Sequence, residues 1–107
     1  MFFQTDLNIS LLQTKGVAAL ELPDVTVEML FKVAFERYKE DPNDYFTRVH
    51  AADGDSLDIS DGNGNLVTTE SVFEYPGITE DVWVIVDDYG PNSTEGLVIT
   101  ILLPEEY

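Results

Sequence analysis

Carboxylates dominate the reactive side chains of this sequence. It contains 21 Asp and Glu residues against five Lys and Arg, with one His, no Cys and a formal net charge of −16. The absence of Cys excludes disulfides, thiolate zinc sites and cysteine nucleophiles. The chemistry that remains is that of carboxylates, which can pair as acid and base, coordinate a hard cation or attract a positively charged partner.

One segment has the spacing of a calcium loop. Residues 61–65 (Asp-Gly-Asn-Gly-Asn) reproduce the D-x-N-x-N opening of an EF-hand. The sixth position of that loop requires Gly and is Leu66 here, and the twelfth requires a bidentate Glu and is Val72. Glycine and asparagine between two apolar runs are typical of a hairpin turn, so we predict a turn. The alternative is a calcium site formed by Asp53, Asp55 and Asp61.

No constellation typical of catalysis is found. The single histidine, His50, follows Arg48 in a predicted strand, where a packing or surface role is favoured. Asp87 and Asp88 resemble the acid–base pair of glycoside hydrolases in residue type only, because neighbours in a polar loop predict no shared cleft. The sequence has no glycine-rich phosphate loop, HExxH or GxSxG motif. We therefore predict no catalytic residue, no metal site and no cofactor, and expect that the protein is not an enzyme.

The elements that must position these carboxylates begin with a predicted β-hairpin. Apolar residues alternate over 1–12, residues 13–16 turn the chain, and 17–22 form the returning strand. A helix follows over roughly 26–40, with Asp24 or Thr26 as its cap. Its apolar stripe consists of Val27, Leu30, Phe31, Ala34, Phe35 and Tyr38.

The second half of the sequence predicts strands. We expect them over 45–52, 57–60 and 66–69, a single helical turn over 71–75, and two buried strands over 82–86 and 97–103. The whole chain, 1–107, then forms one α+β domain. One long helix packs on a mixed or antiparallel sheet of five to six strands, in a β-grasp-like or roll topology.

The last two strands are apolar on both faces, yet the sequence offers one long helix to cover them. Trp83, Ile85, Val98 and Leu102 lie on one face and Val84, Val86, Ile99 and Ile101 on the other, and one of the two faces lacks an obvious cover. We favour a sheet that curls into a partial barrel and covers itself. The alternative is that this face is a homodimer or partner interface.

The acidic excess is regional, since thirteen acids and no Lys or Arg lie between Val49 and Tyr107. Carboxylates two residues apart in a strand lie about 6.6 Å apart on one face, a spacing that can imitate successive phosphates. We predict a partner-binding surface with Tyr75, Tyr89 or Tyr107 as aromatic anchors. The residues predicted to form it are Asp53, Asp55, Asp58, Asp61, Glu70, Glu74, Glu80, Asp81, Asp87, Asp88, Glu95 and Tyr89.

The charge therefore indicates a binding protein whose partner is basic. The first hypothesis is an inhibitor that mimics nucleic acid and blocks a basic DNA- or RNA-binding protein, as phage anti-CRISPR and anti-restriction proteins do. The alternatives are an immunity protein or antitoxin against a basic nuclease toxin, and an oligomeric structural or calcium-binding module. Direct nucleic-acid binding is not expected without a basic stripe. The sequence shows neither a signal peptide nor an apolar run of about 18 residues, so we expect no membrane contact and a cytoplasmic location.

Overall fold

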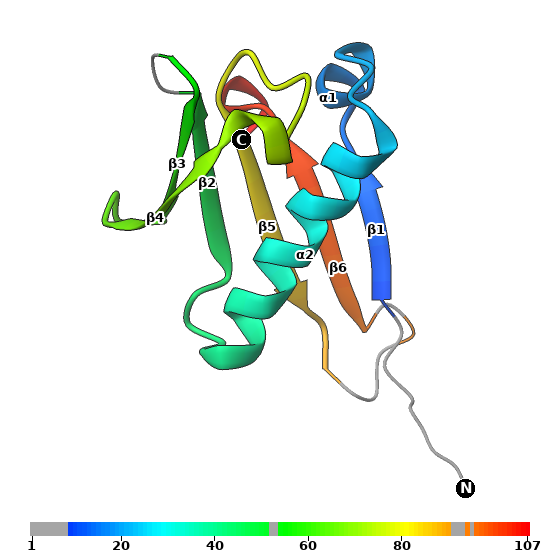
Figure 1. Ribbon diagram of the computed structural model, residues 1–107. Coiled ribbons are helices and arrows are strands. Elements are labelled where there is room, and N and C mark those ends of the chain that lie inside the picture. The colour runs from blue at the N-terminus through cyan, green and yellow to red at the C-terminus, as the bar shows by residue number, and fades with distance from the viewer. Residues whose placement is uncertain (1–8, 52–53, 91–93, 95) are drawn as a thin grey trace, which may run out of the picture.

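A computed structural model describes residues 9–51, 54–90, 94 and 96–107 of the chain (Figure 1). In the described residues, one long helix lies across a six-stranded sheet to form a compact α+β domain. The elements in chain order are β1 (Ile9–Gln13), α1 (Lys15–Ala19), α2 (Asp24–Glu40), β2 (Phe46–Ala51), β3 (Ser56–Asp61), β4 (Leu66–Ser71), η1 (Val72–Glu74), β5 (Val82–Asp88), β6 (Leu97–Leu102) and η2 (Pro104–Glu106).

The sheet has the strand order β1-β6-β5-β2-β3-β4. Strand β1 pairs with β6 in parallel, with Ile9 opposite Leu97 and Gln13 opposite Ile101, and the other neighbours are antiparallel. The predicted N-terminal hairpin is therefore wrong, because the strand expected to begin the hairpin pairs with the last strand of the chain. The predicted β-grasp-like topology depended on this hairpin, and the observed strand order differs from it.

The predicted second strand over 17–22 is wrong, because residues 17–19 belong to helix α1 and residues 20–22 form no strand. Thr14 caps α1, since its Oγ1 accepts a hydrogen bond from the Val17 backbone N–H at 3.3 Å. Val17 is fully buried, so the short apolar run enters the core as one turn of helix. A residue with an oxygen-bearing side chain before a short apolar run is a helix-start signal, and here it outweighed the apparent strand pattern.

Helix α2 confirms the predicted helix and begins two residues earlier, at Asp24. The predicted cap is wrong, because Pro23 occupies the cap position and makes no side-chain hydrogen bond there. Thr26 is instead fully buried inside the first turn, where its hydroxyl donates to the Pro76 carbonyl. Pro42 cannot continue a helix, and α2 ends before Asp41.

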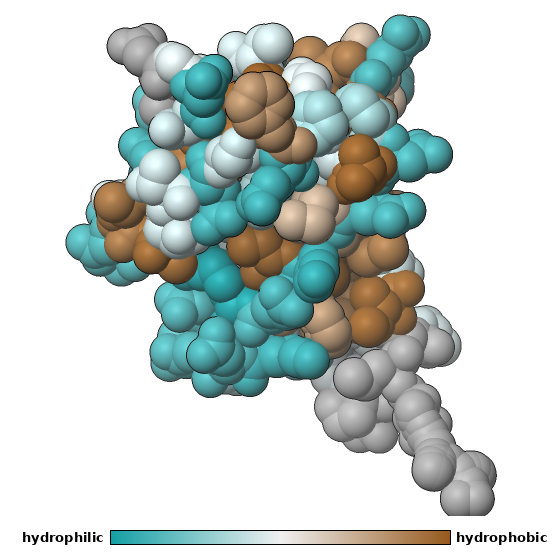
Figure 2. Space-filling model, in the orientation of Figure 1, coloured by the Kyte–Doolittle hydropathy of each residue, from teal (hydrophilic) through white to brown (hydrophobic). Residues whose placement is uncertain are grey.

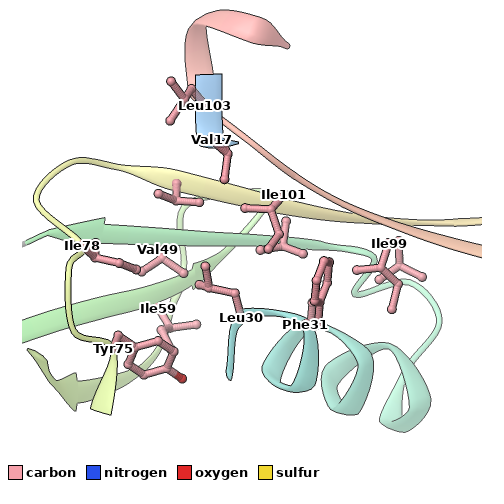
Figure 3. Close-up of a cluster of buried hydrophobic side chains, with 14 of the residues drawn as sticks. Val17, Leu30, Phe31, Val49, Ile59, Tyr75, Ile78, Ile99, Ile101 and Leu103 are labelled. Carbon is pink, nitrogen blue, oxygen red and sulfur yellow. The ribbon is translucent and has the colours of Figure 1, made fainter. Parts of the chain in front are cut away.

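The core lies between α2 and one face of the sheet, the helix-covered face. Leu30 and Phe31 project from α2 toward the strands, where they meet side chains that include Ile99 and Ile101 (Figure 3). Val17 and Leu103 lie at one margin of the same cluster. Strands β2, β3, β5 and β6 each alternate buried residues with more exposed ones, which places their apolar residues on this face.

The opposite face of the sheet, the open face, has no helix across it in the described residues and is turned away from the viewer in Figure 1. Strands β5 and β6 are therefore not buried on both faces, since Trp83, Ile85 and Val98 are half-buried there. The predicted partial barrel is also wrong, because the edge strands β1 and β4 lie at opposite ends of the strand order. No helix in the described part of the chain is long and apolar enough to cross a membrane.

Candidate functional site

The predicted partner-binding acids lie at both ends and along the margins of the sheet. Because β5 runs from Val82 to Asp88, residues just before and just after it stand at opposite ends. Asp55, Glu74, Glu80 and Asp81 lie at the end where β5 begins, and Asp87, Asp88 and Tyr89 lie at the other. Asp58, Asp61 and Glu70 lie on β3 and β4. Asp53 and Glu95 lie outside the described residues.

The carboxylates are mostly not neutralised by bases. Within the described residues, the ion pairs join Arg37 to Asp44 at 3.4 Å and His50 Nδ1 to Asp81 Oδ1 at 2.7 Å. Asp55, Glu74, Glu80 and Asp87 are exposed. Exposed acids therefore outnumber exposed bases at both ends of the sheet in the described residues, where Lys15 lies at one end and Lys39 at the other.

Two of the acids also hold turns in place. Asp61 accepts backbone hydrogen bonds from Asn65 at 2.8 Å and Asn63 at 2.9 Å, and these contacts lower the pKa of its carboxyl group. Asp88 accepts from the Tyr38 hydroxyl at 2.7 Å and the Gly90 N–H at 2.8 Å, which lowers the pKa of Asp88. The predicted turn over 61–65 is thus confirmed as the β3–β4 connection.

The geometry does not support the alternative calcium site. Asp55 precedes β3 and Asp61 ends it, so about 20 Å of extended strand separates them. Asp53 lies outside the described residues. No group of three or more His, Cys, Asp or Glu side chains in the described part of the chain is arranged to hold a metal ion.

One of the five bases belongs to the core. Arg37 on α2 is 8% exposed and donates to the Phe46 carbonyl at 2.9 Å and the Thr47 hydroxyl at 2.7 Å. Thr47 is 1% exposed, so this guanidinium satisfies a buried hydroxyl and ties α2 to β2. Arg37 is therefore mainly a structural base, and the exposed carboxylate that it neutralises is Asp44.

A cluster of three aromatic rings lies on the open face. Phe46, Trp83 and Tyr107 form the aromatic cluster, with ring centroids 5.1 Å apart for Phe46–Trp83 and 5.6 Å for each ring to Tyr107. All three pairs are edge-to-face, an arrangement that aromatic quadrupoles favour. Arg48 stands beside the cluster, with its guanidinium carbon 5.3 Å from the centre of the Trp83 ring.

The surface beside the cluster is hollowed on both sides of Arg48 and Trp83. One hollow, of about 380 Å³, is walled by the aromatic cluster together with Asp44 and Asp61. The other, of about 330 Å³, contains His50 and Asp81. Arg48 and Trp83 line both hollows, so the two adjoin on the open face, and together they are called the groove below.

Glu106 fastens the end of the chain that supplies Tyr107. Its carboxylate accepts from the Thr14 hydroxyl, from the Leu103 N–H at 2.9 Å and from the Gly16 N–H at 3.0 Å. These donors lower the pKa of Glu106, with the Thr14 hydroxyl contributing most. A Cβ on Gly16 would stand 2.7 Å from a Glu106 carboxylate oxygen, so the contact requires glycine there.

The predicted aromatic anchors divide into one buried and two exposed side chains. Tyr75 is 3% exposed, and its burial raises its pKa to about 12, so it cannot anchor a partner. Tyr89 and Tyr107 are 57% and 76% exposed. The sequence predicted that one face of the last two strands lacks a cover without indicating which face, and the gathering of Phe46, Arg48 and Tyr107 around Trp83 was not predicted. Alternation along β2 places Phe46 and Arg48 on that face, whereas no local signal places Tyr107 there.

A second exposed apolar surface lies at the β1 edge. A groove of about 350 Å³ runs between β1 and α2, lined mainly by apolar residues that include Leu11, Phe31 and Phe35, together with Glu28 and Lys32. Ile9 and Leu11 are 41% and 53% exposed. Figure 2 shows hydrophobic residues at the surface along this margin of the helix-bearing side, with further hydrophobic residues at the opposite margin.

Comparisons of the chain with protein-family models, with curated proteins and with solved structures found no match.

Proposed function

We propose that this chain is a non-catalytic inhibitor that presents carboxylates in place of phosphates to a basic, nucleic-acid-binding protein. The observation that carries the proposal is the exposed acid at both ends of the sheet with few bases to neutralise it. A net charge of −16 exceeds the magnitude of about 2–8 that solubility needs, and the excess costs stability by self-repulsion. The excess negative charge therefore serves, in this proposal, to attract a basic partner.

The rigid sheet supports this mechanism. Antiparallel strands hold Asp55 and Asp81 at one end and Asp87 at the other, so the charges keep fixed separations. Such a field steers a basic partner toward the chain at rates that salt reduces. Exposed aromatic side chains such as Tyr89 then add contact area at the interface.

The partner class follows from the same physics. Phage-encoded anti-CRISPR and anti-restriction proteins work by such a contact, and their target lies in the host cytoplasm. An immunity protein or antitoxin that neutralises a basic nuclease would use the same surface and the same attraction. In both cases the partner carries a groove that otherwise holds phosphates.

Competition with nucleic acid tests the proposal directly. The immobilised chain captures basic proteins from a cell lysate at low salt, and excess duplex DNA is then added. If the chain occupies a phosphate-binding groove, the captured nucleic-acid-binding proteins are released, because both ligands need the same bases. Captured proteins that remain bound in excess DNA would contradict mimicry.

Charge reversal with matched controls locates the binding surface. Changing the exposed acids Asp55, Glu80 and Asp87 to Lys should slow association with the captured partner about tenfold or more at low salt. Changing three exposed bases to Glu alters the charge by the same amount in the opposite direction and should leave the rate unchanged or raise it. Those bases are Lys15, Lys32 and Lys39.

A further inference from the structure

The hollow of about 380 Å³ on the open face has two chemically different walls. One wall is aromatic and includes Phe46, Trp83 and Tyr107. The other contains the carboxylates of Asp44 and Asp61. Its volume falls within the range of about 300–1,000 Å³ that is usual for small binding pockets.

The carboxylate wall is negatively charged at neutral pH. Backbone and side-chain hydrogen bonds from Asn65 and Asn63 lower the pKa of Asp61, which keeps that group ionised. Asp44 is held at 3.4 Å by Arg37, while its own side chain stays 43% exposed. Asp44 is thus held by Arg37, and Asp61 by the Asn63 and Asn65 backbone N–H groups, and both carboxylates line the hollow.

The aromatic wall already accepts a guanidinium group. Arg48 lies 5.3 Å from the centre of the Trp83 ring, within the distance at which a ring quadrupole attracts a cation. This contact shows that the indole can hold a flat cation at the surface of the sheet. A planar guanidinium suits such a site better than an ammonium, because it stacks on rings and donates to carboxylates in a fixed fork.

We propose that this hollow binds an arginine side chain of the basic partner, between the aromatic cluster and the carboxylates of Asp44 and Asp61. The inference rests on the proposed function, which supplies a basic partner, and it adds the point where that partner is anchored. The broad acidic field then sets the rate of encounter, and this hollow sets how long the complex lasts.

Arg48 distinguishes a cation site from an anion site. If the hollow takes arginine, Arg48 competes with the incoming guanidinium for Trp83 and repels it. Arg48→Gln should then tighten binding of a cationic probe. If the groove instead takes a phosphate, Arg48 is its main ligand and the same variant should abolish binding.

The probe is a capped ten-residue peptide of alternating arginine and glycine, with a lysine–glycine peptide for comparison. Trp83 is the single tryptophan, so its fluorescence reports occupancy of the groove, and calorimetry gives the affinity. We expect the arginine peptide to bind several-fold more tightly than the lysine peptide. Asp61→Asn, which retains the acceptor oxygen for the turn, should weaken arginine-peptide binding about tenfold. Trp83→Leu should weaken it about fivefold.

Asp87→Asn is the matched control, since it removes one exposed carboxylate that does not line the hollow. Equal losses for Asp61→Asn and Asp87→Asn would mean that the acidic field binds the peptide diffusely, and would overturn the pocket while leaving the proposed function intact. Absence of arginine-peptide binding would also overturn it. So would tighter binding of inorganic phosphate than of the peptide, or a homodimer in sedimentation that Trp83→Leu dissociates. The DNA-competition experiment above tests the proposed function independently of these results.

Discussion

The two faces of the sheet use the same alternation of residues for different purposes. On the helix-covered face, Val49, Val84 and Ile99 are at most 1% exposed and pack under α2. On the open face, the residues between them include Phe46, Arg48 and Trp83, which remain half-buried around a groove. The comparison indicates that stability is concentrated on one face and that binding chemistry can vary on the other.

The largest expected loss of stability comes from a substitution on the helix-covered face. Leu30→Ala should lower the free energy of unfolding by about 2–5 kcal/mol, because a fully buried leucine leaves a cavity between α2 and the strands. The control on the open face is Ile85→Ala, where a half-buried side chain should cost about 1–2 kcal/mol. Urea denaturation of both variants measures the difference. Equal losses would mean that the open face is as much a core as the covered one.

A smaller effect concerns the buried base. Arg37→Met should lower the free energy of unfolding by about 1–3 kcal/mol, because the buried Thr47 hydroxyl and the Phe46 carbonyl lose their donor. Lys32→Met removes an exposed charge from the same helix and should change stability by less than about 0.5 kcal/mol. Thermal melts of the pair separate structural from surface cations. If the two variants melt together, Arg37 has no structural role.

These contrasts also show what the sequence could reveal. Helix α2 and strands β2 to β6 were predictable, because a helical apolar stripe marks α2, while β-branched, aromatic or apolar runs beside turn residues mark the strands. The apolar runs of β5 and β6 indicated that one face lacks a cover, but not which face. The buried position of Arg37 was not predictable, because a helical base is usually exposed and its acceptors lie on the following strand.

The N-terminal region was misread for a physical reason. The partner of Ile9 is Leu97, 88 positions along the chain, and no local pattern encodes a pairing at that separation. The short apolar run that follows residues 13–16 resembled the second strand of a hairpin, whereas its first residues belong to helix α1. Tyr107 joins the aromatic cluster for the same kind of reason, since its position depends on the distant contact of Glu106 with Thr14 and Gly16.

The smallest expected effect concerns the C-terminal segment, where Tyr107 lies against Trp83 on the open face. The pKa of Glu106 is lowered from its usual value of 4.5 by its hydrogen bonds, so the folded state favours the ionised form. A lowered folded-state pKa gives stabilisation that is fully present above the unfolded value and lost as the pH falls through the folded value. The stabilisation therefore begins to fall below pH 4.5, and we expect Tyr107 to leave Trp83 as the pH falls through the lowered pKa of Glu106 in wild-type protein.

Trp83 emission measures this release against two variants. Glu106→Gln should give at pH 7 the emission that the wild type reaches only in acid, because a neutral amide accepts more weakly from Thr14 and Gly16. Glu105→Gln removes the neighbouring charge and should follow the wild type throughout. The difference between wild type and Glu106→Gln should close as the pH falls, while far-ultraviolet circular dichroism stays constant. If both variants follow the wild type at every pH, Glu106 does not hold Tyr107 on the open face, and the aromatic cluster is maintained by its ring contacts alone.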